Sequence, residues 1–159
     1  MLKKLMSTHA PASVWLLRLA VGVVFVPEGI QKFLYPDTLG VGRFSKIGIP
    51  APDILAPFVG GCEILCGALL LMGVLTRLAT LPLIIDMLVA VATTKVPILL
   101  KRGFWAMAHE ARADFAMLLG CLFLLIVGAG CWSLDAHFAN LEETALAPPG
   151  AKKPAQEGA

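Results

Sequence analysis

The chain has 159 residues, of which 58% are hydrophobic and 15% are charged, and its formal net charge is +2. A soluble domain of this length usually carries about 25% charged residues, and a mean hydropathy of +0.81 is too high for a surface that faces water. These values argue against a soluble domain and indicate a small integral membrane protein. The Lys and Arg residues are scattered along the chain and the few aromatic residues are not interleaved with them, so nothing supports binding to nucleic acid.

Four long apolar segments predict membrane-spanning helices, at about residues 14–34, 54–75, 78–100 and 113–134. Each has about the twenty residues needed to cross roughly 30 Å of hydrocarbon at about 1.5 Å per residue. The alternative, buried helices in a large soluble core, is disfavoured because too little polar sequence remains to cover four such segments. We therefore predict an all-α fold, a transmembrane up-down four-helix bundle in residues 14–135 with small residues where the helices touch.

The two ends of the chain are more polar than this domain. Residues 1–13 form an N-terminal flank in which Lys3 and Lys4 resemble the start of a signal peptide. However, Arg18 interrupts the apolar run and no small-residue cleavage pattern follows, so we expect the first helix to be retained. Residues 136–159 are polar and rich in Pro, Ala and Lys, which predicts a disordered tail.

The connections between the predicted helices differ in length. The segment "GVLTR" between the second and third helices is short and requires an antiparallel hairpin, in which Thr76 can cap the third helix. The segment "KRGFWAMAHEAR" precedes the fourth helix and places Phe104 and Trp105 beside basic residues, as is typical of a membrane interface.

Charged residues within or beside the apolar segments are the candidate binding site. A charge in the middle of a bilayer costs about 2.5–3.5 kcal/mol on insertion scales, so such groups should face the bundle interior and find partners. Glu28 and Lys32 lie one helical turn apart, and so do Glu110 and Asp114. The complete predicted polar cluster is Arg18, Glu28, Lys32, Glu63, Asp86, Glu110 and Asp114.

Two interpretations of this cluster remain open. The charges can act as structural ion pairs that fix the order of the helices, or they can line a polar cavity that binds a solute, a proton or a quinone head group. Lys32, Lys95 and Arg112 could instead extend their charged groups to the membrane interface. Glu63 shares a helix face with Gly67, whose small size allows a neighbouring helix to approach.

The cysteines and histidines offer weaker signals. Cys62 and Cys66 lie one helical turn apart, which is neither the C-x-x-C redox spacing nor a good geometry for a disulfide. They and Cys121 read mainly as small buried hydrophobic residues, with a redox role as the alternative. No Cys and His spacing indicates a metal, and no histidine lies inside a predicted helix to hold a haem.

Three stretches of the sequence resemble the DoxX family of small bacterial membrane proteins. They are "EGIQKFLYP", "GIPAPDILAPFVGGCEILCGALLLMGVLTRLA" and "FAMLLGCLFLLIVGAGCWSLD", and the resemblance covers about residues 16–135. The matching features are Gly29 and Lys32, the "GIP" before the second helix, the spacing of Glu63 and Gly67, and the "SLD" at the end. The resemblance implies a multi-pass protein of the bacterial inner membrane with four helices. Relatives are linked to quinone-coupled thiosulfate oxidation and to membrane complexes that handle thiol or oxidative stress, but the resemblance implies no catalytic residues.

Three functional hypotheses follow. The protein could be a membrane subunit of a redox system, with a quinone as the one candidate cofactor. It could be a small-solute or proton carrier that uses the same polar cavity. It could also be a non-catalytic scaffold that docks a soluble oxidoreductase. The expected partners are the lipid bilayer, a soluble oxidoreductase or second membrane subunit, and further copies of the chain, because four helices enclose little volume.

Overall fold

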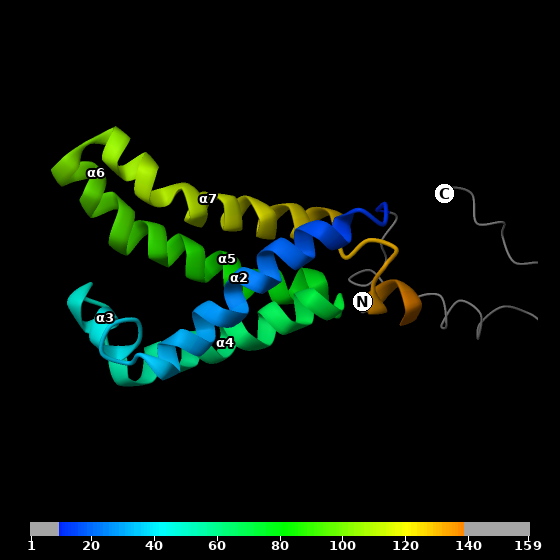
Figure 1. Cartoon of the computed structure of the whole chain (residues 1–159), viewed down its shortest axis with the longest axis horizontal. Helices are drawn as coiled ribbons and strands as arrows, with labels where there is room; N and C mark the ends of the chain where they lie inside the picture. Colours follow the sequence, from blue (N-terminus) through cyan, green and yellow to red (C-terminus); the bar gives the residue numbers. More distant parts are fainter. Residues whose placement is uncertain (1–9, 139–159) are drawn as a thin grey trace, which may run out of the picture.

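The computed structural model describes residues 10–138, and in this range every regular element is a helix (Figure 1). The expected disordered tail at 136–159 and the flank at 1–13 therefore lie largely outside the described residues. The helices are α2 (Val14–Leu34), α3 (Val41–Lys46), α4 (Pro52–Met72), α5 (Thr76–Ala90), the π-helical segment η1 (Val91–Lys95), α6 (Val96–Arg102) and α7 (Phe104–Val127).

The described helices form two antiparallel pairs. Helix α2 packs along α4, and α5 packs along α7, while α5, η1 and α6 follow one another as a single helical segment (Figure 1). The pairs meet at the short turn between α4 and α5 and diverge toward the end of the molecule that carries α3 and α6. This arrangement confirms the predicted all-α bundle.

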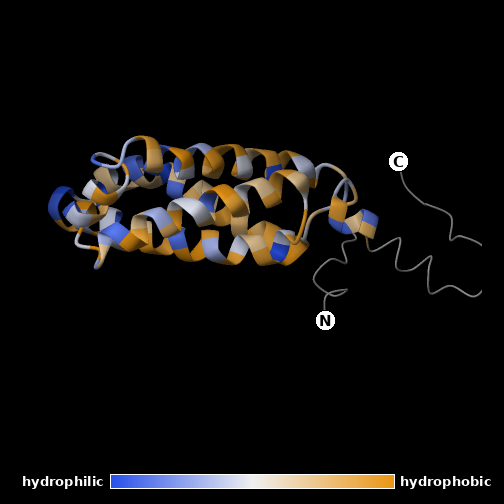
Figure 2. Ribbon diagram, turned by 90° about the horizontal axis from the view of Figure 1, so that it is seen from below, coloured by the Kyte–Doolittle hydropathy of each residue, from blue (hydrophilic) through white to orange (hydrophobic). Residues whose placement is uncertain are grey.

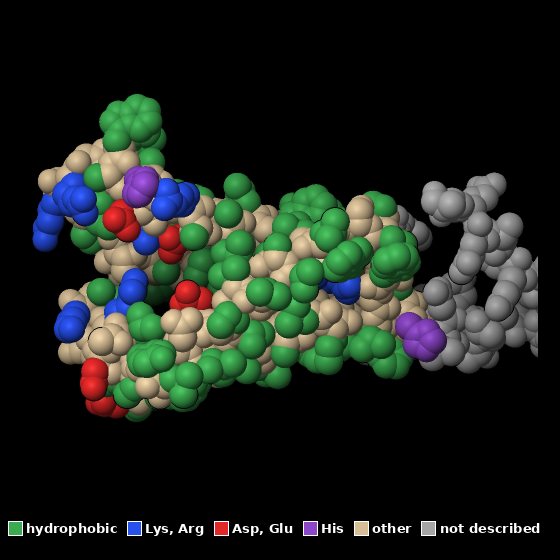
Figure 3. Space-filling view, viewed as in Figure 1, with side chains coloured by type: hydrophobic (Ala, Val, Ile, Leu, Met, Phe, Trp, Pro, Cys, Tyr) green, Lys and Arg blue, Asp and Glu red, His purple; other side chains and the backbone are tan. Residues whose placement is uncertain are grey.

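Three of the described helical segments are long and apolar enough to cross a membrane, namely α2, α4 and Thr76–Arg102. Helix α7 has 24 residues, but Glu110, Arg112 and Asp114 interrupt its first half, and its apolar part follows them. Hydrophobic residues cover most of the long helices, and hydrophilic residues gather at the α3 and α6 end (Figures 2 and 3). The bundle therefore presents an apolar surface of the kind that contacts lipid.

The helix bounds differ most from expectation in the fourth helix, predicted at 113–134 and found at Phe104–Val127. Its first turns read "FWAMAHEAR", and Ala, Met, Glu and Arg favour a helix although they are not all apolar. The helix ends at Gly128, which has a φ of 90° that glycine adopts without strain. The segment expected as a linker is therefore mostly helical. Hydropathy identifies apolar segments and does not detect a helix that contains polar residues.

Small residues allow α2 and α4 to approach closely. A Cβ atom added at Gly29 would lie 2.5 Å from the carbonyl oxygen of Gly60, and one added at Gly67 would lie 2.9 Å from Cγ2 of Val26. A side chain at Gly29 would overlap the backbone of α4, so the contact requires glycine there, and one at Gly67 would have to displace Val26. The expected role of Gly67 in helix approach agrees with this packing.

The end of the bundle opposite α3 and α6 is held by polar contacts. Asp135 is 1% exposed, and its two carboxylate oxygens accept the backbone N–H groups of Leu75 (2.7 Å) and Thr76 (3.0 Å). Asp135 thus caps α5 in place of Thr76, the cap expected from the sequence. The Nη2 atom of Arg18 donates to the carbonyl oxygen of Trp132 (2.5 Å), which ties α2 to the same segment.

Candidate binding cavity

A cavity of about 930 Å³ lies between the two helix pairs. All the described helical elements except α6 contribute to its wall, and the molecule is hollowed at the α3 and α6 end, where acidic side chains are visible inside the cleft (Figure 3). Most of the wall is apolar. Its polar and thiol-bearing residues are Glu28, Gln31, Lys32, Arg43, Cys62, Glu63, Cys66, Asp86, Thr93, Thr94 and Asp114.

The centre of the site is formed by Lys32 of α2, Glu63 of α4 and Asp86 of α5, which we call the acid–lysine cluster. The Nζ atom of Lys32 lies 2.5 Å from Oε2 of Glu63, whose side chain is 3% exposed. The carboxyl groups of Glu63 and Asp86 also lie near each other and interact electrostatically. Two carboxyl groups that share a site avoid two adjacent negative charges when one of them keeps its proton. The cluster therefore combines a cation with two neighbouring acids.

Glu63 lies near the middle of its helix. It is about 17 Å along α4 from Pro52 and about 14 Å from Met72, at about 1.5 Å per residue. A charge in the middle of a membrane-spanning helix must be compensated by protein or by a ligand. The pairing with Lys32 supplies that compensation and agrees with the expectation that buried charges find partners.

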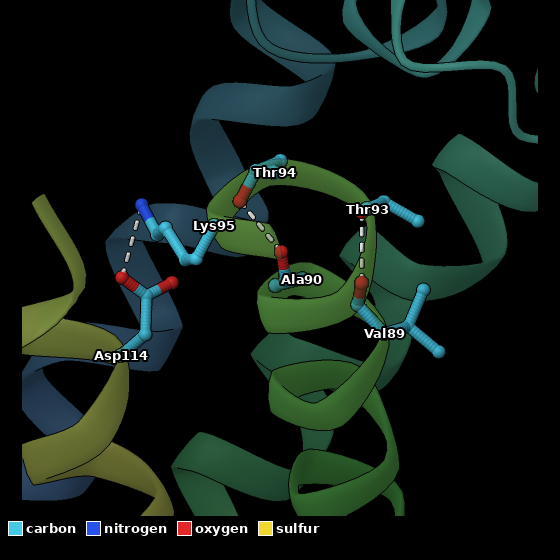
Figure 4. Close-up of polar contacts among 6 residues, drawn as sticks. All are labelled: Val89, Ala90, Thr93, Thr94, Lys95 and Asp114. Atoms are coloured by element: carbon cyan, nitrogen blue, oxygen red, sulfur yellow. Dashed lines mark hydrogen bonds and ion pairs between the residues drawn. The ribbon is translucent and has the colours of Figure 1, made fainter. Parts of the chain in front are cut away.

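A second ion pair lies where the π-helical segment faces α7. The Nζ atom of Lys95 lies 3.1 Å from Oδ2 of Asp114 (Figure 4). The hydroxyl groups of Thr93 and Thr94 donate to the carbonyl oxygens of Val89 (2.8 Å) and Ala90 (2.5 Å), one turn earlier. π-helical turns are rare and occur often at functional sites. Here the wider turn coincides with two hydroxyl-bearing residues in the cavity wall.

The structure brings together five of the seven predicted charges, because Glu28, Lys32, Glu63, Asp86 and Asp114 all line the cavity. Glu28 is exposed, and its charge acts on Asp86.

The remaining two predicted charges lie elsewhere. Glu110 is exposed and is not part of the wall. Arg18 shares a face of α2 with Lys32 but lies about 21 Å away along the helix axis, where it contacts Trp132. Sequence spacing gave the shared face but could not place the two charges at opposite ends of the bundle.

The thiols occupy two environments. Cys62 and Cys66 belong to the cavity wall, whereas Cys121 is fully buried in the core beside Leu124. The described cysteines are all free. Within residues 10–138, no group of three or more His, Cys, Asp and Glu side chains has a geometry that could hold a metal ion.

Several wall residues were not predicted from the sequence. Gln31 and Arg43 add donors near the open end, and Thr93 and Thr94 add hydroxyl groups. The signal for Gln31 was present, since it is a polar residue inside an apolar run beside Lys32. Arg43 could not be found in this way because it lies on α3, a short helix within a segment rich in Gly and Pro.

Known proteins resemble this chain in sequence. An uncharacterized membrane protein of Mycobacterium tuberculosis, Rv3486, is 53% identical over 143 residues, which are 86% of this chain and 88% of that protein. The Bacillus subtilis protein named "Putative oxidoreductase CatD" is 28% identical over 120 residues, which are 76% of this chain and 82% of that protein. No solved structure matches the chain. The sequence pattern of the DoxX family matches residues 13–96. With its lipid-facing helices and its close similarity to a membrane protein over most of its length, the chain belongs to the DoxX family of membrane proteins.

Proposed function

We propose that this protein is a component of a redox system in the bacterial inner membrane and that its cavity binds the head group of a quinone. The observation that carries the proposal is the acid–lysine cluster, which faces a cavity of about 930 Å³ near the middle of α4. The relative named "Putative oxidoreductase CatD" supports the redox assignment, and the bacterial origin of both relatives supports the location.

The chemistry of the cavity fits a quinone head group. Such a group is a flat, mainly apolar ring that carries carbonyl oxygens, and it supplies two-electron chemistry coupled to protons when bound. The ammonium group of Lys32 can donate to one carbonyl oxygen, and the carboxyl group of Glu63 or Asp86, when protonated, can donate to another. Apolar wall residues such as Phe25 and Phe44 provide contacts for the ring. The volume also falls in the usual range for small-molecule sites, roughly 300–1,000 Å³.

A basic rim supports an orientation for this site. Arg43, Lys46, Lys101 and Arg102 are all exposed at the α3 and α6 end, where the cavity is hollowed (Figure 3). Short loops on the cytoplasmic side of inner-membrane proteins are enriched in Lys and Arg. The proposal therefore places the open end toward the cytoplasm, where a soluble oxidoreductase or a second membrane subunit can exchange electrons with the bound ring.

Purification in a mild detergent, followed by mass spectrometry of retained lipids and quinones, tests the proposal first. Titration with decylubiquinone then gives a dissociation constant. We expect Lys32→Met to weaken binding by about 10- to 100-fold, since a hydrogen bond from a charged group contributes about 1.5–3 kcal/mol. Lys46→Met is the matched control, because Lys46 is exposed and lies outside the cavity wall.

Two results would contradict the proposal. One is wild-type protein that neither retains a quinone nor binds decylubiquinone. The other is equal binding by the Lys32 and Lys46 variants, with thermal unfolding showing that both are folded. Accumulation of a water-soluble solute in sealed vesicles, without any quinone binding, would favour the carrier hypothesis instead.

A further inference from the structure

The cavity wall includes a strip of apolar residues that are also exposed on the outer surface of the bundle. On α4 the strip contains Phe58 and Leu65, and on α5 it contains Leu78, Leu81 and Ile85. Leu65 is 62% exposed and Ile85 is 63% exposed. A side chain that both lines a cavity and reaches the surface marks an opening, so the cavity is open sideways between α4 and α5.

The arrangement of the helices explains this opening. Helices α4 and α5 are joined by a short turn and diverge from it, while each packs mainly against another partner, α2 or α7 (Figure 1). The strip follows one face of each helix, at spacings of three, four and seven residues. In a membrane this side of the bundle faces acyl chains and not water.

The other side of the cavity has a different character. Between α2 and α7, the wall residues of α2 that reach the surface are Val24 and Glu28, and the wall residues of α7 are Ala113, Asp114 and Met117. Carboxylates on both helices make that side unsuitable for an apolar chain. The side between α4 and α5 is therefore the one suited to a hydrocarbon chain.

The strip passes the acid–lysine cluster at the same depth. Leu65 follows Glu63 by two residues, and Ile85 immediately precedes Asp86, while Glu63 and Asp86 interact electrostatically across the gap. A molecule whose polar head contacts the cluster can thus extend a chain past the apolar side chains of Leu65 and Ile85 into the bilayer.

We infer that the gap between α4 and α5 is a lateral port through which the cavity takes its ligand from the bilayer, and that this ligand carries a long apolar chain on its polar head. The inference rests on the proposed quinone site and narrows it to chain-bearing quinones, with the chain held along the strip. Water-soluble quinones have no chain and therefore cannot make the contact with the strip.

The port is tested with two ligands and two matched pairs of variants in lipid nanodiscs. The ligands are decylubiquinone and its tailless form, ubiquinone-0. Leu65→Trp and Ile85→Trp narrow the port, while Leu119→Trp and Ile126→Trp place the same bulk on α7 at residues that are 64% and 75% exposed and lie outside the cavity wall. We expect the port variants to bind decylubiquinone about tenfold more weakly than wild type and to bind ubiquinone-0 with an affinity within about twofold of wild type. The α7 variants should bind both ligands as wild type does.

The outcomes separate the two proposals. If neither ligand binds wild-type protein, the quinone site itself is wrong. If both ligands bind but the port variants weaken neither, or weaken both equally, the port is wrong and the quinone site remains.

A second measurement uses wild-type protein and so does not depend on the folding of any variant. A decylubiquinone with a photoreactive diazirine at the end of its chain is bound and irradiated, and the labelled peptides are identified by mass spectrometry. Labels on Phe58, Leu65, Leu78, Leu81 or Ile85 support the port. Labels confined to α3 and α6 overturn it, because they would place the chain at the end of the bundle.

Discussion

The carboxylate of Asp135 caps α5 from a distant part of the chain, since its Oδ1 atom accepts the N–H group of Leu75, 60 residues earlier, at 2.7 Å. Leu75 has a φ of 47°, a conformation that side-chain-bearing residues rarely adopt. The backbone of Asp135 also donates to the carbonyl oxygen of Gly73 (2.9 Å). The segment after α7 therefore closes the turn that joins the two helix pairs.

Replacement of Asp135 should destabilise the whole bundle. Asp135→Ala leaves two backbone N–H groups at the start of α5 without their buried partner, which should cost about 2–4 kcal/mol. The midpoint of thermal unfolding, followed by circular dichroism in detergent, should fall by several degrees. Asp53→Ala is the control, because Asp53 lies in the first turn of α4 but is exposed. Equal unfolding midpoints for the two variants would show that the cap contributes little.

Replacement of Gly29 and of Gly61 by alanine should change the stability of the protein in opposite directions. At Gly29 a Cβ atom would lie 2.5 Å from the carbonyl oxygen of Gly60, so Gly29→Ala should push α2 from α4 and cost about 1–3 kcal/mol. At Gly61 a Cβ atom would meet nothing within 4 Å. There alanine should stabilise the helix by about 0.5–1 kcal/mol. Unfolding of both variants in the same detergent compares them, and a Gly29 variant as stable as wild type would refute the close approach.

The ion pair between Lys32 and Glu63 should show strong energetic coupling. Lys32→Met deprives two acids of their cation and should cost about 3–5 kcal/mol. Glu63→Gln should cost less, because Lys32 retains Asp86 nearby. The double variant should be more stable than the sum of the single effects predicts, by about 1.5–3 kcal/mol. A double-mutant cycle on unfolding free energies measures this coupling, and additive effects would mean that the two side chains do not interact in the folded protein.

The pair between Lys95 and Asp114 should contribute much less. Both side chains are partly exposed, 13% and 18%, so solvent screens the attraction. We expect Asp114→Asn to change the unfolding free energy by about 1 kcal/mol or less. An effect as large as that of Lys32→Met would show that this end of the cavity is as dry as its centre.

The sequence predicted the bundle because long apolar runs have one stable solution in lipid, the helix. It located the second and third helices to within a few residues, since Gly73 and the following turn interrupt the hydropathy. The fourth helix was misplaced because "FWAMAHEAR" is helical without being wholly apolar, and a prediction from hydropathy does not include such a segment in a helix. The π-helical turn was also missed, because Val91–Lys95 has no residue pattern that distinguishes it from an ordinary helix.

The candidate site could be predicted in part for a similar reason. A charge in lipid needs a partner, so Lys32, Glu63 and Asp86 were identifiable from their position in apolar segments. Which charges meet depends on the axial position and rotation of each helix, and these are set by contacts such as Gly29 against Gly60. Arg18 was grouped with the cluster because it lies on the same face of α2 as Lys32. Its position along the helix axis, however, places it at the opposite end of the bundle.

Glu63 and Asp86 lie on facing halves of the bundle, since one acid belongs to the α2 and α4 pair and the other to the α5 and α7 pair. A ligand that enters between these halves must offer polar atoms to the groups whose contacts it replaces. The width and the polarity of the ligand are thereby linked: a bulky hydrocarbon would separate the halves without replacing those contacts, while the reduced, dihydroxy form of a quinone could donate from opposite edges of its ring to both carboxylates.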